Sequence, residues 1–333
     1  MSVWLKNVFS YESSDKKRAG ECRKLFESKN LISYELEEIE ERALALTKIV
    51  VLVKWESSNV VHTEHLEFGC SYQQEDGSVG YPWKDNGFGY LKIDYNINTG
   101  IGVDGEESLG ENLRQHMEAV RNFIIKIKKE IPDIMIENCA SGGCRLEPSM
   151  MDITGMSSAS DTHDVYEGAI VAANLHYLTP PRQNQVWCTL RPQYDHNRFT
   201  HIISIGFLGR LCWSGDIAGL SKTQLDELFA AEKFYERVAP IIKHGNSYIY
   251  RTDICSFHSP TGTQAVVRYS EDGDEALVVI HTFEDMKNMK ITLKGNYKIA
   301  DSLYENTACI KGDVLEISNM SDFTGNVLLL SKK

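Results

Sequence analysis

The sequence contains few cysteines and no long apolar run. Among its 333 residues are 8 cysteines, and only Cys139 and Cys144 lie close together in the chain. This spacing does not suggest a disulfide framework, so a cytoplasmic location is expected. No apolar stretch reaches the roughly 18 residues that a membrane-spanning helix needs. The N-terminal segment also lacks the apolar core of a secretory signal.

Positive charge is also scarce. The chain has 35 Lys and Arg against 47 Asp and Glu, a formal net charge of −12. No basic stripe interrupts the acidic background, so nucleic acid is excluded as a partner. The hydrophobic content of 42% is typical of a globular protein. The length suits one large domain followed by a small one.

Strand and helix signals alternate between residues 86 and 245, whereas residues 1–85 give a poorly defined pattern. In the first part only Ile49–Lys54 resembles a buried strand, and Cys70–Trp83 resembles a loop or hairpin. From residue 86 onward, alternating strands and helices predict a parallel sheet with helices outside. The predicted strands are Tyr90–Tyr95, Ile134–Asn138, Met156–Ser160, Val186–Thr189 and Leu211–Trp213.

Two long helices are predicted within this segment. Glu111–Glu130 carries apolar residues at spacings of three and four, and Pro132 ends it. Ser221–His244 begins with a capping box formed by Ser221 and Gln224.

The period changes after residue 245. Short alternating segments separated by turn residues predict a small antiparallel β-sandwich over residues 246–333. The predicted strands are Ala265–Tyr269, Ala276–His281, Lys290–Leu293, Val314–Ile317 and Val327–Leu330.

The sequence YLKIDYN places three polar residues at alternate positions of a predicted strand. Lys92, Asp94 and Asn96 would share one face, because strand side chains alternate between the two faces. Near the carboxyl end of a barrel strand, such a row is typical of catalytic groups. A half-exposed edge strand would give the same alternation.

The sequence ENCASGGCR, from Glu137 to Arg145, runs from a predicted strand into a glycine-rich loop. Its glycines would let backbone amides approach a ligand, or would simply form a tight turn. Glu137, Cys139 and Cys144 lack the second cysteine pair expected of a zinc site. We therefore expect no metal at this loop.

Ionisable residues also cluster in SDTHD, from Ser160 to Asp164. One reading is a helix N-cap near Val165, and another is a metal site formed by Asp161, His163 and Asp164.

Two tryptophans, Trp187 and Trp213, lie at predicted strand ends. Each could stack on a sugar ring or fill the core.

The three motifs, in this order and spacing, resemble those of glycoside hydrolase family 36, the α-galactosidase family. The resemblance implies a (β/α)₈ TIM barrel, with strands similar to the fourth to eighth, followed by the β-sandwich. It also implies a retaining mechanism with Asp94 as nucleophile and Asp161 as general acid/base, without cofactor or metal. The implied substrate-binding residues are Lys92, Asn96, Cys139, Gly142, Asp164 and Trp213.

This resemblance leaves alternatives open. Asp164 is the second choice for the acid/base. The substrate expected is a terminal α-galactoside, and N-acetylgalactosamine is the alternative sugar. Three barrel units would have to fit into the first 90 residues, so the barrel is expected to be truncated, and a homo-oligomer is expected. A catalytically inactive carbohydrate-binding remnant and a metal-dependent hydrolase using Asp161 and His163 are the competing hypotheses.

Overall fold

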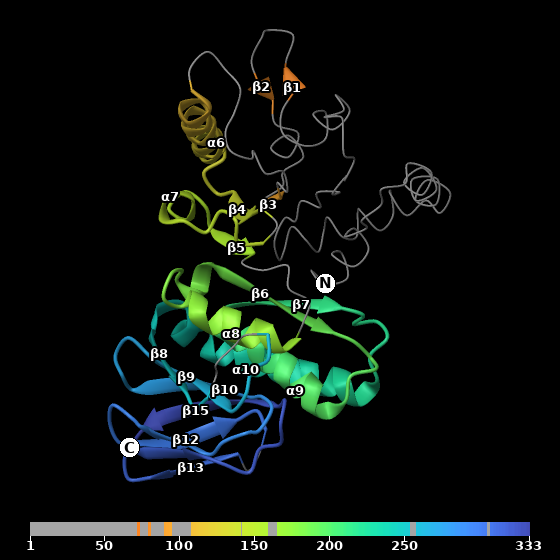
Figure 1. The fold of residues 1–333 in the computed structure, drawn as a ribbon, viewed down its shortest axis with the longest axis vertical. Helices are drawn as coiled ribbons and strands as arrows, with labels where there is room; N and C mark the ends of the chain where they lie inside the picture. Colours follow the sequence, from red (N-terminus) through yellow and green to blue (C-terminus); the bar gives the residue numbers. More distant parts are fainter. Residues whose placement is uncertain are drawn as a thin grey trace. The chain divides into compact units, whose positions relative to one another are not determined.

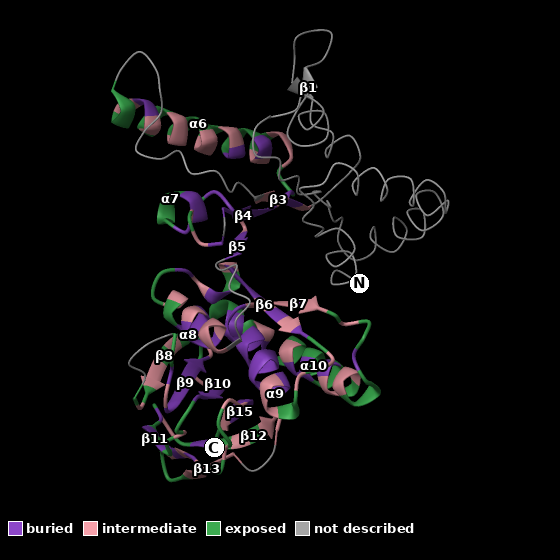
Figure 2. Cartoon of the chain, turned by 45° about the vertical axis from the view of Figure 1, so that its right-hand side comes forward, coloured by how far each residue is buried: buried purple, intermediate pink, exposed green. Residues whose placement is uncertain are grey.

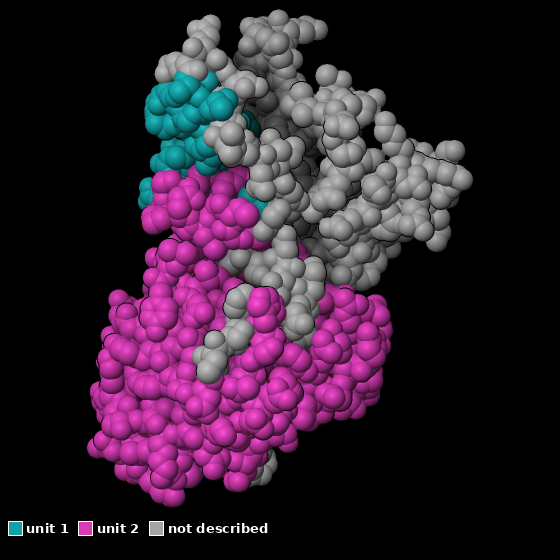
Figure 3. Space-filling model, viewed as in Figure 1, with its two compact units in different colours: residues 1–140, 152–155 teal, residues 141–151, 156–333 magenta. Residues whose placement is uncertain are grey.

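The computed structural model describes most of the chain after residue 107 and short segments before it (Figure 1). Contacts divide the chain into two compact units, residues 1–140 with 152–155, and residues 141–151 with 156–333 (Figure 3). The described residues are 72–73, 79–80, 90–94, 108–140, 142–158, 165–253, 258–304 and 307–333. The strand predicted at Ile49–Lys54 lies outside them.

The described residues of the first unit include one antiparallel and one parallel strand pair. Strands β1 (Tyr72–Gln73) and β2 (Val79–Gly80) pair antiparallel, which confirms the hairpin alternative for this region. Strands β3 (Tyr90–Asp94) and β4 (Met135–Cys139) pair in parallel, as predicted. Helix α6 (Leu109–Glu130) lies between them in the sequence, so the three elements form a β–α–β unit.

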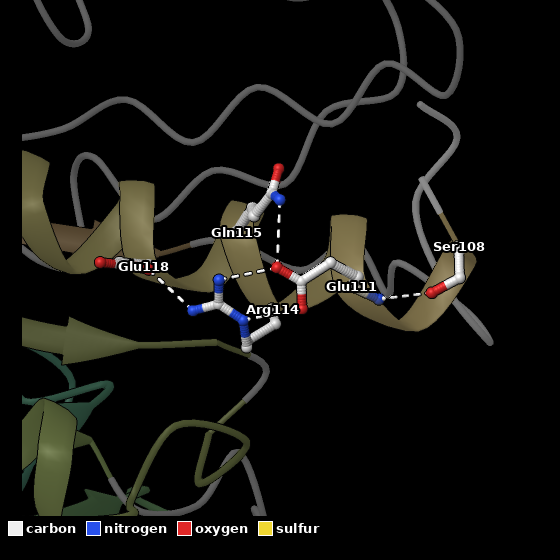
Figure 4. A network of polar contacts seen from close by, with 5 residues as sticks. All are labelled: Ser108, Glu111, Arg114, Gln115 and Glu118. Carbon is white, nitrogen blue, oxygen red and sulfur yellow. Dashed lines mark hydrogen bonds and ion pairs between the residues drawn. The ribbon is translucent and has the colours of Figure 1, made fainter. Parts of the chain in front are cut away.

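Helix α6 is stabilised at its start by polar side chains. The Ser108 hydroxyl accepts a hydrogen bond from the Glu111 amide at 3.2 Å. Arg114 forms ion pairs with Glu111 and Glu118, at 2.7 Å and 2.9 Å, and Gln115 donates to Glu111 (Figure 4). These contacts join residues three and four positions apart, so the charged face supports the helix itself.

Parallel strands and helices alternate in the first half of the second unit. Strands β5, β6 and β7 are parallel neighbours in that order. Their positions agree with the prediction. The elements are α7 (Pro148–Met151), β5 (Met156–Ser158), α8 (Val165–Leu175), η1 (Pro181–Gln183), β6 (Asn184–Leu190), α9 (His196–Ile205), η2 (Gly206–Leu208), β7 (Arg210–Gly215) and α10 (Lys222–His244).

Helix α9 was not predicted. Its residues from Phe199 to Ile205 are all buried (Figure 2), including three polar ones, so burial in this helix does not follow the polarity of the sequence. Its one local signal is Asp195, whose carboxylate accepts from the Arg198 amide at 2.8 Å. Helix α10 confirms its prediction, since Ser221 and Gln224 form the capping box and Gly245 is the C-cap.

The C-terminal part forms two antiparallel sheets, in agreement with the predicted sandwich. One sheet has the order β12-β15-β10-β9-β8, and the other has the order β11-β14-β13. A buried apolar cluster draws residues from both sheets, for example Val278, Leu315 and Leu330. Strands β8, β12 and β13 were missed. The strands are β8 (Asn246–Arg251), β9 (Thr263–Tyr269), β10 (Glu275–Thr282), β11 (Met289–Thr292), β12 (Tyr297–Ser302), β13 (Ala308–Lys311), β14 (Val314–Ile317) and β15 (Gly325–Lys332).

Polar groups join this β domain to the helices of the same unit. Arg268 of β9 donates to the Ile241 carbonyl at 2.8 Å and to the Ser247 hydroxyl at 2.7 Å. Gln264 donates to the Ala169 carbonyl at 3.0 Å. The secondary structure changes between α10 and β8, at the boundary predicted from the sequence. The division into domains at residues 85 and 245 stays a prediction.

Candidate active site

Strands β3 and β4 bring the first two sequence motifs side by side. The parallel register pairs Lys92 with Glu137 and Asp94 with Cys139. Residues paired in register in a parallel sheet lie on the same face, and so do alternate positions of one strand. Positions 92, 94, 137 and 139 therefore form one row on one face of the strand pair.

An ion pair crosses this row. The Lys92 ammonium lies 3.2 Å from a carboxylate oxygen of Glu137, with side-chain exposures of 22% and 0%. A carboxylate buried to this degree needs a cation or several hydrogen-bond donors to remain ionised. The sequence did not predict that Lys92 and Glu137 pair. The register of the two strands adds this contact.

The loop after β4 has the backbone conformation that its glycines suggested. Gly142 is buried and has φ of +75°, a left-handed conformation that strains residues with a Cβ. Cys139 is also buried and has 1% of its surface exposed. Cys144, in contrast, is exposed. The conformation of Gly142 fits the turn reading and is compatible with close approach of a ligand.

A second polar cluster lies on β5 and β6. The buried Ser158 hydroxyl donates to the Gln185 side chain at 2.9 Å and accepts from the Trp187 indole nitrogen at 3.1 Å. Register pairs Ser158 with Gln185, so these three side chains share a face. The hydrogen bond orients the half-buried indole of Trp187. The sequence analysis did not predict this cluster. The signal that could have indicated it is the alternation of polar and apolar residues within β6.

The structure corrects the role predicted for Trp213. Register pairs Trp213 with Cys188, which places it on the face opposite to Trp187. Cys188 is fully buried against Gly206 of η2, and Trp213 itself is 8% exposed. Trp213 is therefore a core residue on the helix-covered face of these strands. The alternation of the strand separates the two tryptophans.

The remaining predicted site residues, Asn96, Asp161 and Asp164, lie outside the described residues, as does His163. The side chain of Asp94 is also not described. Among the described residues, no group of three His, Cys, Asp or Glu side chains is arranged to hold a metal ion. Nor does any helix within the described ranges have the length and apolarity needed to cross a membrane.

Parallel strands alternating with helices, followed by antiparallel sheets, define the fold class of this chain. Residues 83–245 match the Melibiase family. The resemblance to the α-galactosidase family is thereby confirmed over this segment.

Individual relatives agree with this assignment. The chain is 28% identical to alpha-galactosidase 2 of Pediococcus pentosaceus over 120 residues, which are 35% of this chain and 17% of that protein. It is 24% identical to a probable alpha-galactosidase C of Aspergillus flavus over 259 residues, which are 73% and 33% of the two chains. The chain thus spans a third or less of these relatives.

Solved structures show the same fold. The family 36 α-galactosidase AgaA of Geobacillus stearothermophilus, crystallised with 1-deoxygalactonojirimycin, superposes with a TM-score of 0.63 at 20% identity. The match covers 75% of this chain and 36% of AgaA. The α-galactosidase of Lactobacillus brevis gives a TM-score of 0.61 at 17% identity, over 75% and 36% of the two chains. A further AgaA variant was crystallised with raffinose.

Proposed function

We propose that this chain hydrolyses terminal α-galactosides with retention of configuration. The observation that carries the proposal is the polar row of β3 and β4 within the segment that matches the melibiase family. Strand interiors between helices are normally apolar, so a buried ion pair beside the candidate nucleophile favours a functional explanation. Strands β3 to β7 would be the fourth to eighth strands of a (β/α)₈ barrel.

In the proposed reaction, the Asp94 carboxylate attacks the anomeric carbon as the glycosidic bond breaks. Asp161 gives its proton to the departing oxygen. Asp161 then takes a proton from water, and the resulting attack on the anomeric carbon releases Asp94 and galactose. Two carboxyl groups roughly 5–5.5 Å apart are required for such a double displacement.

The remaining family positions would bind the sugar. We assign hydroxyl binding to Lys92, Asn96, Cys139 and the backbone of Gly142. Trp187 replaces Trp213 as the candidate aromatic contact, because its ring is half-buried and its indole nitrogen is held by Ser158. Substituting Trp187→Ala should raise KM for the galactoside more than it lowers kcat.

The test is release of nitrophenol from an aryl α-galactoside by the purified chain. The Asp94→Asn variant should lose at least three orders of magnitude in kcat/KM, because the amide cannot form the covalent intermediate. Asp226→Asn is the matched control, since Asp226 is exposed on α10 and pairs with Lys222. Equal activity of wild type and Asp94→Asn would contradict the assignment.

A second function is saccharide binding by the same polar row without catalysis. A folded wild-type chain that binds galactose without turnover would support it. Parallel assays with an aryl α-N-acetylgalactosaminide decide between the two candidate sugars.

A further inference from the structure

An open pocket of about 240 Å³ lies on the C-terminal β domain. It is formed by residues after position 245, and none of the residues assigned to catalysis lines it. Sites for drug-sized ligands usually exceed about 300 Å³, so this pocket suits a ligand of one ring. The side chains that matter for its chemistry are Asn246, Tyr248, Tyr269, Lys294, Tyr297 and Lys332.

Three tyrosine rings form one wall of the pocket. The rings of Tyr248 and Tyr269 pack edge to face with centroids 5.8 Å apart and an interplanar angle of 68°. Tyr269 and Tyr297 are also 5.8 Å apart, at 49°. Tyr269 and Tyr297 are buried, whereas Tyr248 is 38% exposed. Tyr248 is therefore the exposed ring of this wall, and the buried rings support it.

Hydrogen bonds fix the inner part of this wall. The Tyr297 hydroxyl donates to the Gly273 carbonyl at 2.6 Å. The backbone amide of Lys294 donates to the Tyr269 hydroxyl at 3.0 Å. Two rings are thus held at both the ring and the hydroxyl end, so a ligand that packs against them would lose little of its binding energy to ordering the protein.

Nitrogen donors surround the rings. The Lys294 ammonium lies 3.5 Å from the centroid of Tyr248, where the ring face holds it. Lys332 pairs with Asp274 at 3.2 Å, so its charge is largely balanced. Asn246 is exposed and contributes a side-chain amide. The pocket therefore combines tyrosine side chains with N–H donors, and Lys294 contributes its positive charge.

We infer that this pocket binds one neutral pyranose unit. The C–H face of a pyranose packs against an aromatic ring, and its hydroxyl oxygens accept from ammonium and amide groups. The source of the sugar rests on the proposed function, since a galactoside hydrolase meets galactose both in its substrate and as its product. The pocket would be a second saccharide site, distinct from the polar row of β3 and β4.

The experiment uses galactose and the full chain with Asp94→Asn, which removes turnover. Reductive ¹³C-methylation of the lysines keeps their charge and gives each an NMR signal, assigned through Lys→Arg variants. The Lys294 signal reports on the pocket, and the Lys92 signal reports on the proposed active site. Galactose should shift the Lys294 signal in a saturable manner, with a dissociation constant on the order of 1 mM.

Variants separate ring packing from nonspecific effects. Tyr248→Ala should weaken the response of Lys294 about tenfold, because it removes the exposed ring. Tyr177→Ala is the matched control, since Tyr177 is exposed elsewhere in the same unit. Asn246→Ala should weaken the response without disturbing the rings.

Some results would overturn the inference. They are an unchanged Lys294 signal at saturating galactose, an unaltered response in Tyr248→Ala, or loss of binding at high salt, which would mark an anion site. A shift of Lys294 without a shift of Lys92 or turnover would reject the proposed active site and leave the pocket intact.

Discussion

The parallel strands and the C-terminal β domain differ in where they place polar side chains. In the parallel strands, polar side chains of neighbouring strands pair on one face, as Lys92 does with Glu137 and Ser158 does with Gln185. In the β domain, the cluster between the sheets is apolar, and polar groups such as Arg268 lie where the domain meets the helices.

The contrast suggests different roles for the two regions: the parallel strands hold the candidate reactive groups, and the β domain contributes stability. Burying a charge pair costs desolvation energy that an apolar pair would not. The parallel strands therefore carry groups that reduce their own stability, which is typical of a functional site. The β domain gains its stability from apolar burial, and its accessible chemistry lies at its surface pocket.

The largest expected effect comes from the general acid of the proposed site. Asp161→Ala should reduce kcat/KM for raffinose by 10²–10⁴-fold, the usual contribution of a positioned acid or base. The loss should be smaller for a nitrophenyl galactoside, because its leaving group needs less protonation. Kinetics with both substrates provide the measurement.

The neighbouring carboxylate supplies the control for that experiment. Asp164→Ala should not show the difference between the two leaving groups. If Asp164→Ala shows it and Asp161→Ala does not, the roles of the two residues are exchanged.

Removing the cation from the polar row should be the largest stability change. Lys92→Met leaves the buried Glu137 carboxylate without its ammonium and should cost about 3–5 kcal/mol. Adding Glu137→Gln should recover part of this loss, because it removes the buried charge. Urea unfolding of the single and double variants tests both expectations.

An exposed ion pair gives the comparison for Lys92. Lys222 lies 2.6 Å from Asp226, with side-chain exposures of 87% and 62%. Lys222→Met should therefore change stability by less than about 1 kcal/mol. Similar costs for Lys92→Met and Lys222→Met would mean that the row is not a buried electrostatic unit.

Low pH should destabilise the contacts between the β domain and the helices of the same unit. Burial lowers the pKa of His176 to about 4, while its bond to the Leu208 carbonyl opposes the shift and the charge of Arg268 adds to it. Its other ring nitrogen lies 2.9 Å from the Ser247 hydroxyl. In the unfolded chain, the imidazole binds its proton with a pKa near 6.5. The contribution of neutral His176 to stability is therefore fully present above that pH and is lost as the pH falls toward 4.

His176→Gln tests this pH dependence, because glutamine keeps a hydrogen-bonding side chain that does not titrate. The variant should lose less stability than wild type between about pH 7 and pH 4.5, by at most roughly 3 kcal/mol. Urea midpoints measured across that range give the comparison. The pKa of the buried His281 is also lowered, so some acid sensitivity should remain. Identical pH slopes for wild type and variant would exclude His176 as a source.

A smaller loss of stability than that of Lys92→Met is expected at the start of β7. The Tyr235 hydroxyl donates to the Gly209 carbonyl at 2.7 Å and accepts from the Leu211 amide at 3.2 Å. Tyr235→Phe removes both bonds and should cost about 2 kcal/mol, since two backbone groups lose a partner. Tyr177→Phe, at an exposed position, is the control for thermal unfolding. A Tyr235→Phe variant as stable as the control would show that water replaces the hydroxyl.

Local signals were sufficient for much of the secondary structure. Strands β3 and β4 followed from short apolar runs, and α10 followed from its capping box and helical period. Helix α9 was missed because it is short and its neighbours bury polar as well as apolar residues between Phe199 and Ile205, so polarity does not mark its exposed side. Strands β12 and β13 are short, and alternate residues remain partly exposed, which weakens the apolar pattern.

The sequence by itself determined the family, the alternation of strands and helices, and the residues that could carry chemistry. These depend on residue types, order and spacing along the chain. Only the tertiary structure decided that Lys92 pairs with Glu137, that Trp187 and Trp213 lie on opposite faces, and that three tyrosines enclose a pocket. The register between strands and the packing of distant segments set these contacts, and neither is encoded in local periodicity.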